Sequence, residues 1–396
     1  MTVGYKTYTC PVGRECGGCE WLSVPYEIQL RRKHEGLVAL YEPFGVSVDP
    51  VIGMDEPICY RAKIQSPFVR GRRGRPHFGM YERRSHNLIE ARECLVEYPE
   101  GRRILETIAN LAWDYHIAPY NEFTGRGLLR HAVIRVGHAT GEVMVTLVVN
   151  RKEFPHKKAF VADLRDEHPE IATVVFNVNT RRTNAVLGPL SMTAYGQGWI
   201  EDEVCGCTFR IPSSAFYQTN PVQTEVLYDK AIELAHLGKD DVVLDAYCGI
   251  GTIGIIAARR SGCALVGIES VHDAVEIAYE NARINRVKNA EFIEGDAGEV
   301  LAKSEGAPSV VFMDPPRGGS SEQFLRCLLD AAPERIVYIS CNPETQVRDL
   351  AVLADRYRIK RVVPVDMFPH TKHCETICLL TRRTFTPGAT PPEHVK

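Results

Sequence analysis

The pattern of hydrophobic and polar positions divides the chain into regions of different texture. Apolar residues recur at helical spacing over residues 100–117, and this predicts a helix there. Two β-like runs at residues 128–136 and 143–150 flank the turn-forming segment 137–141, which predicts a hairpin. A further strand is predicted at residues 173–178. This stretch of the chain is therefore expected to be rich in β-structure.

From about residue 213 onward, short apolar runs alternate with helical patterns. Helices are predicted at residues 253–259 and 273–285. The apolar runs predict strands at residues 242–244, 264–268, 291–293, 309–313 and 335–339. Strands that alternate with helices pair in parallel, so this half is predicted to be an α/β domain with a doubly wound, Rossmann-like sheet.

The length of the chain predicts more than one domain, because 396 residues exceed what one hydrophobic core usually supports. Residues 1–100 are rich in Cys, Arg and Gly and form the first predicted region. A β-rich central domain at residues 101–212 and the α/β domain at residues 213–385 follow. The Pro-containing tail at residues 386–396 is predicted to be disordered.

The composition is that of a globular protein, with 44% hydrophobic and 24% charged residues. No apolar run reaches the roughly 18 residues that span a membrane, and the N-terminus lacks a signal-like segment. A cytoplasmic protein is therefore expected, and its 13 cysteines are expected to be ligands, nucleophiles or core residues rather than disulfides. The net charge of −3 does not exclude a nucleic-acid binder, because phosphate binding needs only a local basic face.

A glycine-containing loop follows the first predicted strand of the α/β domain. Asp245 opens this loop, and Gly249 and Gly251 let the backbone approach a ligand closely. The spacing differs from the dinucleotide-binding pattern, and no Lys-Ser/Thr pair follows as in a phosphate-binding loop. An acidic residue here would repel pyrophosphate but suits a cationic sulfonium, so S-adenosylmethionine is the predicted cofactor.

Three more acidic residues end or follow the succeeding strands. Glu269 stands where a carboxylate accepts hydrogen bonds from ribose hydroxyls, and Asp296 stands near the expected adenine amino group. Asp314 follows the fourth strand. The alternative is a structural glycine turn with the acids as helix N-caps, but their order at successive strand ends favours a cofactor site.

A cysteine and a glutamate late in the domain are candidate catalytic residues. Cys341 follows a predicted parallel strand in a Ser-Cys-Asn-Pro turn, and Glu375 lies 34 positions further on. We interpret the pair as a thiol nucleophile and a general base. A buried cysteine is more often a small core residue, and we interpret Cys248 and Cys374 in that way.

At this point the chain closely resembles the RNA (uracil-carbon-5)-methyltransferases that depend on S-adenosylmethionine. The resemblance covers nearly the whole chain and rests on motifs at residues 216–221, 245–254, 314–319, 340–343 and 370–375. Motifs of this length in this order are specific. The resemblance implies a class I methyltransferase domain, preceded by a small iron–sulfur region and a β-rich RNA-binding domain.

The chemistry of the family implies a role for each matched residue. Carbon 5 of uracil is a weak nucleophile until a thiolate adds to carbon 6, and the resemblance assigns that addition to Cys341. Glu375 would then remove the carbon-5 proton, so that the thiol is eliminated. Asp314 is implied to lie between the cofactor and the target base. Gln218 and Tyr247 are implied to line the cofactor pocket.

Four cysteines in the first region are candidate metal ligands. Cys10, Cys16 and Cys19 are closely spaced and Cys94 is remote, a set that suits an iron–sulfur cluster or structural zinc. The resemblance to one branch of the family implies that these four residues hold a [4Fe-4S] cluster with a structural role. Cys59 is the alternative fourth ligand.

Cationic residues with interspersed aromatic residues are candidate RNA contacts. Residues 70–75 contain four arginines with two glycines between them, and Arg83 and Arg84 follow. Such a segment can bind phosphates and stack on unpaired bases, but an ordinary solvated hairpin explains it equally well. Arg130 and Arg135 resemble family positions on the substrate side. The target pyrimidine is expected to leave its stack to admit attack on its ring.

The expected RNA follows from a comparison of the family's branches. A chain that has the cluster cysteines, but no room before them for an additional barrel, most resembles the branch that methylates uracil 747 of 23S ribosomal RNA. Asp314 stands where that branch often has Asn, and archaeal relatives of similar layout act on transfer RNA. Ribosomal RNA is therefore the expected partner of a monomeric enzyme, with transfer RNA as the alternative.

Two alternative functions agree less well with the motifs. A non-catalytic iron–sulfur protein that binds RNA or senses redox state would show a damaged thiol–carboxylate pair or cofactor loop, and neither is damaged. Methylation at cytosine carbon 5 also uses a thiolate, but in Pro-Cys or Thr-Cys contexts, unlike Ser340-Cys341.

Overall fold

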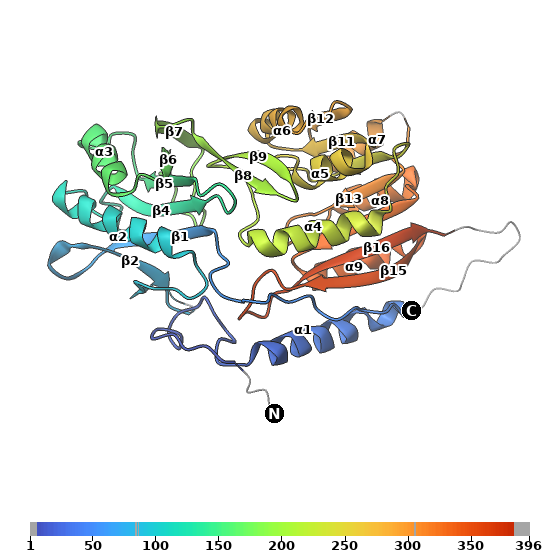
Figure 1. The fold of residues 1–396 in the computed structure, drawn as a ribbon, viewed down its shortest axis with the longest axis horizontal. Helices are drawn as coiled ribbons and strands as arrows, with labels where there is room; N and C mark the ends of the chain where they lie inside the picture. The colour runs from blue at the N-terminus through green and yellow to red at the C-terminus, as the bar shows by residue number, and fades with distance from the viewer. Residues whose placement is uncertain (1–5, 84, 86, 305, 384–396) are drawn as a thin grey trace, which may run out of the picture.

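The computed structural model describes residues 6–83, 85, 87–304 and 306–383. Within them the chain forms two large sheets side by side, with an N-terminal segment that runs along the lower edge of both (Figure 1). The tail predicted to be disordered, residues 386–396, lies outside the described residues. Among the helices that are described, none has the length and apolar character to cross a membrane.

The C-terminal sheet contains, in the described part of the chain, β10 (Val242–Asp245), β11 (Ala264–Glu269), β12 (Ala290–Glu294), β13 (Val310–Met313), β14 (Arg335–Ser340), β15 (Tyr357–Val365) and β16 (Glu375–Arg382). Their order is β12-β11-β10-β13-β14-β16-β15. The pairs among β10 to β14 are parallel, whereas β16 lies antiparallel between β14 and β15. The predicted doubly wound α/β sheet is confirmed, and each predicted strand of this half is present.

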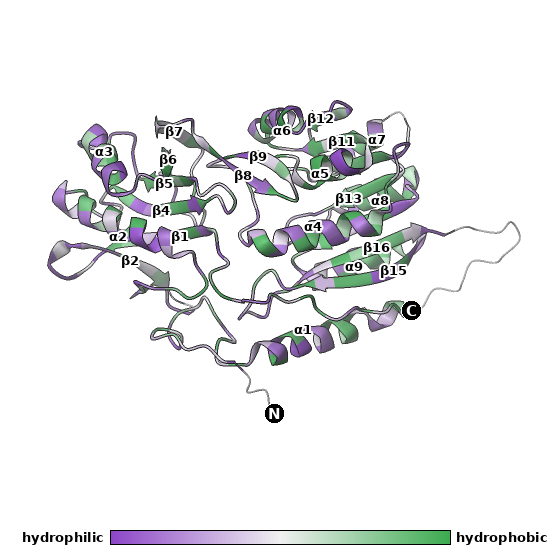
Figure 2. Cartoon of the chain, in the orientation of Figure 1, coloured by the Kyte–Doolittle hydropathy of each residue, from purple (hydrophilic) through white to green (hydrophobic). Residues whose placement is uncertain are grey.

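Helices cover both faces of this sheet. One face carries α4 (Pro221–Ala235), α5 (Thr252–Ser261) and α6 (His272–Ile284). The other carries α7 (Ala297–Lys303), α8 (Glu322–Ala331) and α9 (Pro343–Leu353). Figure 2 shows hydrophobic colouring along the strands and mixed colouring on helices such as α4, as expected when only one helix face packs on a sheet.

Local chemistry explains where these helices begin and end. The side chains of Asn220 and Ser321 accept hydrogen bonds from the backbone N–H groups of Gln223 and Phe324, which caps the first turns of α4 and α8. Gly262, with a φ of 76°, ends α5 in the left-handed conformation that glycine adopts without strain.

The central sheet contains β1 (Lys63–Arg70), β2 (Pro76–Tyr81), β3 (Leu88–Glu90), β4 (Leu129–Val136), β5 (Val143–Val149), β6 (Ile171–Val178) and β7 (Leu190–Tyr195). Their order is β3-β2-β1-β4-β5-β6-β7. The predicted hairpin is the antiparallel pair β4–β5, and the predicted first helix is α2 (Pro99–Asp114). Together with α3 (Lys157–Glu167), α2 packs its apolar residues on this sheet.

The central sheet crosses the domain boundary that was predicted at residue 100. β1 pairs with β4, so residues from both sides of that boundary share one sheet. A separate hairpin of β8 (Trp199–Val204) and β9 (Cys207–Pro212) follows. Its buried Ile200 and Phe209 join the core beneath α4 to α6, so the hairpin packs against the C-terminal domain.

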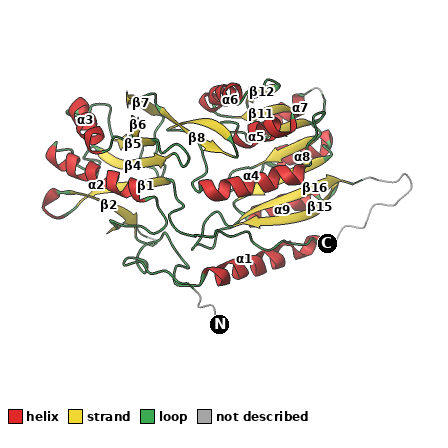
Figure 3. Cartoon of the chain, in the orientation of Figure 1, coloured by secondary structure: helices red, strands yellow, loops and turns green. Residues whose placement is uncertain are grey.

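The N-terminal segment also packs on the C-terminal domain. It contains α1 (Tyr26–Tyr41) and the short 3₁₀ helix η1 (Glu42–Phe44); a second one, η2 (Arg72–Gly74), joins β1 to β2. Leu37 and Tyr41 of α1 share a core with Leu350 of α9. Val48 and Ile52 form parallel bridges to β15. Residues 6–25, the described part of the chain before α1, form a loop (Figure 3) that carries Cys10, Cys16 and Cys19.

Candidate active site

The carboxyl ends of four parallel strands bring the predicted site residues to one edge of the C-terminal sheet. Asp245 and Glu269 end β10 and β11, whereas Asp314 and Cys341 directly follow β13 and β14. The strand order reverses between β10 and β13, which is where open α/β sheets bind ligands. Residues that are far apart in the sequence therefore converge here.

Hydrogen bonds hold the turn that carries Cys341. Ser340 Oγ accepts a hydrogen bond from the backbone N–H of Asn342 at 3.1 Å and donates to its carbonyl oxygen at 3.0 Å. The side chains of Asn342 and Thr345 donate to the carbonyl oxygen of Arg317 at 3.1 and 3.3 Å. The thiol turn is thus tied to the loop that follows β13.

The half-buried thiol of Cys341 lies in an electrostatically mixed environment. Burial raises its pKa to about 11, and the negative charges of Glu375 and Asp314 act in the same direction. The Arg317 guanidinium opposes this rise in pKa through its charge and a hydrogen bond. Because the thiolate is the nucleophilic form, Arg317 is the side chain that favours reaction at Cys341.

Strand pairing places Glu375 beside the thiol. Ser340 of β14 pairs with Thr376 of β16, and Cys341 and Glu375 lie one step further along the two strands. Burial, followed by the charge of Asp314, raises the pKa of Glu375 well above its ordinary value, and Arg317 opposes this. A carboxylate with a raised pKa is a stronger base than an exposed one, which suits proton abstraction.

Two further acids belong to this edge of the sheet: the half-buried Asp314, whose charge acts on both Cys341 and Glu375, and the buried Asp245, on which Asp314 acts. Burial raises the pKa of Asp314 to about 7. Burial also raises the pKa of Asp245 to about 7; a hydrogen bond from the backbone N–H of Gly254, 3.1 Å long, opposes it. A Cβ atom at Gly254 would stand 2.9 Å from Asp245 Oδ2, so glycine is needed for α5 to approach this carboxylate. Such desolvated carboxylates fit a cationic ligand.

The loop between β10 and α5 is shaped by its own glycines. Gly249 and Gly251 have φ values of 54° and 84°, in the left-handed region. The backbone N–H of Gly249 donates to Glu269 Oε2 at 3.1 Å, which links the loop to the end of the neighbouring strand. Glu269 Oε1 accepts a hydrogen bond from the backbone N–H of Val271. The carboxylate is therefore held in place at the edge of the predicted cofactor site.

Comparison with known proteins assigns the chain to a family. Residues 26–383 match the family model described as tRNA (Uracil-5-)-methyltransferase. The chain belongs to this family. An uncharacterized RNA methyltransferase of Staphylococcus aureus (strain MSSA476) is 40% identical, over 93% of this chain and 83% of the relative. Another from Halalkalibacterium halodurans is 41% identical, over 94% and 82%.

A solved structure supports the same assignment. The tRNA (uracil-54, C5)-methyltransferase of Pyrococcus abyssi, in complex with S-adenosyl-L-homocysteine, has a TM-score of 0.78 and 28% sequence identity. The alignment covers 94% of this chain and 87% of that chain. The predicted resemblance is confirmed: this is a uracil-5-methyltransferase family member with an S-adenosylmethionine-dependent class I fold. The family match begins at residue 26, beyond the three cysteines of the N-terminal loop.

The remaining predicted cofactor residues of the methyltransferase domain differ in their surroundings. Asp296 is exposed and caps α7, because its Oδ1 accepts hydrogen bonds from the backbone of Gly298 and Glu299. This is the N-cap role that the sequence left open as an alternative. The Tyr247 hydroxyl donates to Ser320 Oγ at 3.2 Å. The roles of Asp296 and Tyr247 at the cofactor stay predictions.

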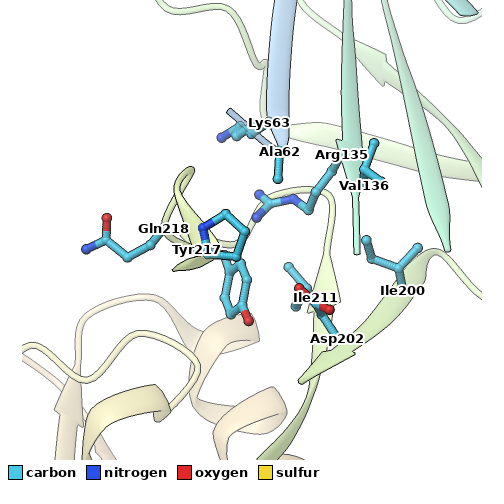
Figure 4. Close-up of a pocket in the computed structure, with 10 residues that line it drawn as sticks. Ala62, Lys63, Arg135, Val136, Ile200, Asp202, Ile211, Tyr217 and Gln218 are labelled. Atoms are coloured by element: carbon cyan, nitrogen blue, oxygen red, sulfur yellow. The ribbon is translucent and has the colours of Figure 1, made fainter. Parts of the chain in front are cut away.

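Gln218 lies at the junction of the central and C-terminal domains. It is buried and lines a small cavity with Arg135, Tyr217 and other residues (Figure 4). The figure shows the Gln218 side chain extending away from Arg135. Arg135 was predicted to face the substrate. Its Nη2 donates to the carbonyl oxygen of Ala215 at 2.9 Å, so its side chain forms a contact at the domain junction.

The four predicted cluster ligands line a single cavity. Cys10, Cys16, Cys19 and Cys94 surround it together with apolar residues such as Leu22. Burial raises the pKa of Cys19 to about 12, and the other three thiols contribute in the same direction. The exposed Cys59 does not line this cavity. Within the described residues, no group of three His, Cys, Asp or Glu is placed to hold a single metal ion.

A polar cavity lies between the N-terminal loop and the central sheet. Arg61, Lys63, Arg83, Arg130 and His131 line it. Three of its nitrogen atoms, Nε of Arg61 and Arg130 and Nδ1 of His131, are buried without a hydrogen-bond partner among the described residues. Unpaired buried nitrogens of basic side chains fit an anionic ligand.

The arginine-rich turn lies apart from this cavity. It occupies the tip between β1 and β2, where Arg72 and Arg73 are exposed and Arg75 donates to Asn110 at 2.8 Å. Arg84 lies outside the described residues. The exposed tip agrees with either of the two interpretations that the sequence left open.

Two functional features were missed from the sequence. Arg317 contacts the thiol, and the only signal for it was its position three residues after Asp314. The second is a groove beside Cys341 that α1 helps to form. His373 also lines this groove, and burial together with the charge of Arg317 lowers the pKa of its ring.

Proposed function

We propose that the protein methylates carbon 5 of a specific uridine in RNA, with Cys341 as nucleophile and Glu375 as general base. The observation that carries this proposal is the pairing of β14 with β16, which puts the thiol and the buried carboxylate next to each other. Membership of the uracil-5-methyltransferase family supplies the reaction class. Arg317 is the cation that stabilises the thiolate.

The reaction follows from the chemistry of the pyrimidine. The Cys341 thiolate adds to carbon 6, a carbon–sulfur bond forms, and the ring becomes an enolate that is nucleophilic at carbon 5. Carbon 5 then takes up a methyl group. Glu375 removes the remaining carbon-5 proton, the carbon–sulfur bond breaks, and the thiolate is regenerated. Glu375 is buried, whereas Cys341 is half-buried and opens onto the groove through which a base would enter.

The cofactor site is formed by acids from three strand ends. When bound, S-adenosylmethionine supplies an electrophilic methyl group. Asp245 and Asp314 are carboxyls with raised pKa values that a sulfonium or ammonium cation would stabilise in the charged form. Gly249 holds Glu269 where its carboxylate would accept hydrogen bonds from ribose hydroxyls. Gln218, Tyr247 and Asp296 complete the proposed set.

The four-cysteine cavity fits a [4Fe-4S] cluster. Its thiols stand around an apolar space, and a cluster of several atoms needs more room than one metal ion. The resemblance to one branch of the family favours the cluster over zinc. Cys10, Cys16, Cys19 and Cys94 would hold it, and its role is structural because methyl transfer moves no electrons.

For the RNA we propose 23S ribosomal RNA, at a uridine of the uracil-747 type. The cluster cysteines, shared with that branch of the family by resemblance, support this choice. Transfer RNA is the second candidate, favoured by the similarity to the Pyrococcus abyssi enzyme and by Asp314. A monomeric, cytoplasmic enzyme is part of the same proposal.

The deciding experiment compares the two RNAs directly. The full-length protein, purified without exposure to oxygen, is incubated with labelled S-adenosylmethionine and either 23S fragments or transfer RNA transcripts. We expect label in 5-methyluridine of the 23S fragment that contains the target hairpin. Label in transfer RNA alone would replace the proposed substrate, and label in neither would overturn the proposed reaction.

A further inference from the structure

The groove beside Cys341 has two walls of different origin. One wall consists of the segments that follow β13 and β14 and precede β16, with Arg317, Cys341 and Lys372. The other consists of the N-terminal segment, with Trp21 and Arg32. The reactive thiol therefore opens onto a surface that α1 completes.

The α1 wall is rigidly attached to the catalytic segments. Lys33 Nζ lies 2.7 Å from Asp366 Oδ1, and both side chains are almost fully buried. Gln29 donates to the carbonyl oxygen of Trp21 at 3.0 Å and accepts from the backbone N–H of His370 at 2.9 Å. Buried polar contacts of this kind fix the position of a helix relative to the loop that it contacts.

The rim of the groove is positively charged. Arg32, Arg317 and Lys372 are exposed, whereas the charge of Lys33 is neutralised by Asp366. The acidic Glu344 also lines the groove, and Glu20 lies 4.0 Å from Lys372 Nζ. Arg32 has neither a hydrogen bond nor an ion pair with any described residue. Its guanidinium is therefore available for a ligand.

The geometry of a nucleotide indicates which ligand this rim would take. A base that reaches the thiol must be unstacked, and its ribose and flanking phosphates then stay at the mouth of the site. Exposed guanidinium and ammonium groups bind phosphate oxygens through charge-assisted hydrogen bonds. An anion at the rim also keeps its charge away from Asp314 and Glu375, which lie deeper.

We propose that α1 forms part of the RNA-binding site and that Arg32 binds a backbone phosphate next to the target uridine. This inference rests on the proposed function, because it takes the uridine at Cys341 as its reference point. It adds an RNA contact from the N-terminal segment, on the opposite wall of the groove from the catalytic loops. An acidic protein segment is the other ligand that such a rim could bind.

The test uses two neighbouring arginines of α1. Arg31 and Arg32 are both exposed, but only Arg32 lines the groove. Arg32→Ala and Arg31→Ala are compared in the full-length protein for binding of a 23S fragment and a transfer RNA transcript across a range of salt concentrations. Arg32→Lys tests whether a point charge is sufficient.

For Arg32→Ala we expect about tenfold weaker RNA binding and a salt slope reduced by about 0.7–0.9, the loss of one phosphate contact. Arg31→Ala should stay within about twofold of the wild type, and Arg32→Lys should recover most of the slope. Binding of S-adenosylhomocysteine should be equal in all variants, which shows that the fold is intact.

The outcomes separate this inference from the proposed function. If the wild type methylates RNA but Arg32→Ala matches Arg31→Ala, the phosphate contact at Arg32 is wrong. If RNA binding depends on Arg32 while no RNA is methylated, the proposed reaction fails and the contact stands. Failure of the wild type to bind either RNA would overturn the contact and leave an acidic protein segment as the ligand to examine.

Discussion

Cys341 and the four cysteines of the N-terminal cavity are all half-buried, but they differ in what surrounds the sulfur. Burial raises the pKa of Cys341 to about 11 and that of Cys19 to about 12. Around Cys341 stand two carboxyls and Arg317, whereas around Cys19 stand three further thiols and Arg61. The first set allows one thiol to form and break a covalent bond, and the second set suits shared ligation of a cluster. Neighbours from distant segments, not the residue type, separate the two roles.

The largest effect should come from Cys341→Ala, which removes the proposed nucleophile and leaves the four-cysteine cavity intact. We expect no measurable methyl transfer, because carbon 5 of uracil is not nucleophilic without the thiolate adduct. Cofactor binding should be retained, and iron content should equal that of the wild type. Residual turnover in this variant would contradict the assigned nucleophile. Cys374→Ala, a neighbouring buried cysteine, is the matched control and should stay active.

The next largest effect is expected from Glu375→Gln, which should separate addition of the thiol from removal of the carbon-5 proton. In Glu375→Gln, Cys341 can still add to carbon 6, but the carbon-5 proton is not removed. We expect turnover to fall by about 10²–10⁴-fold and a covalent protein–RNA adduct to accumulate, visible on a denaturing gel. Loss of turnover without an adduct would mean that Glu375 acts before the thiol adds, and not as the base.

A third prediction addresses the cluster side of the comparison. Cys94→Ala should abolish bound iron and sulfide in the anaerobically purified protein and lower its melting temperature by several degrees, because Cys94 is the proposed fourth ligand of the cluster. Cys59→Ala is the matched control, since Cys59 is exposed and outside the cavity. Iron retained in Cys94→Ala but lost in Cys59→Ala would identify the other cysteine as the fourth ligand.

Much of the catalytic domain could be predicted from the sequence because its structure is local. Each parallel strand is a short apolar run followed by a helix, so the strand-end positions of Asp245, Glu269 and Asp314 could be read directly. The position of Cys341 after β14 followed in the same way. Parallel topology then placed all of them at one edge of the sheet.

Contacts between distant segments could not be predicted in this way. The insertion of β16 between β14 and β15 sets Glu375 beside Cys341, and no local pattern encodes which strands pair. The pairing of β1 with β4 likewise carries the central sheet across the predicted boundary at residue 100. The placement of α1 against α9 depends on buried residues such as Tyr41, whose partners are over 300 residues away.

A smaller effect tests the cation beside Cys341. Arg317 lowers the pKa of the Cys341 thiol, so Arg317→Met should raise that pKa further. At pH 8 the thiolate fraction, and with it the rate of alkylation of Cys341 by iodoacetamide, should fall about tenfold per pKa unit. Alkylation is followed by mass spectrometry of the Cys341 peptide, with Cys59 as an internal reference. An unchanged rate would show that Arg317 does not stabilise the thiolate.

The smallest expected effect concerns Asp245, a buried carboxyl whose raised pKa should make the stability of the protein depend on pH. Burial raises the pKa of Asp245 to about 7, above the ordinary value near 4 of an unfolded chain. The folded state therefore holds this proton more tightly, and the free energy of unfolding should fall as the pH rises from about 4 to about 7. Asp245→Asn keeps an acceptor for the N–H of Gly254 and removes the charge. The cofactor-free variant should be more stable than the wild type at pH 8, by on the order of 1–4 kcal/mol, and equally stable at pH 4. Urea unfolding at the two pH values measures this, and a variant less stable at pH 8 would show that the Asp245 charge stabilises the fold.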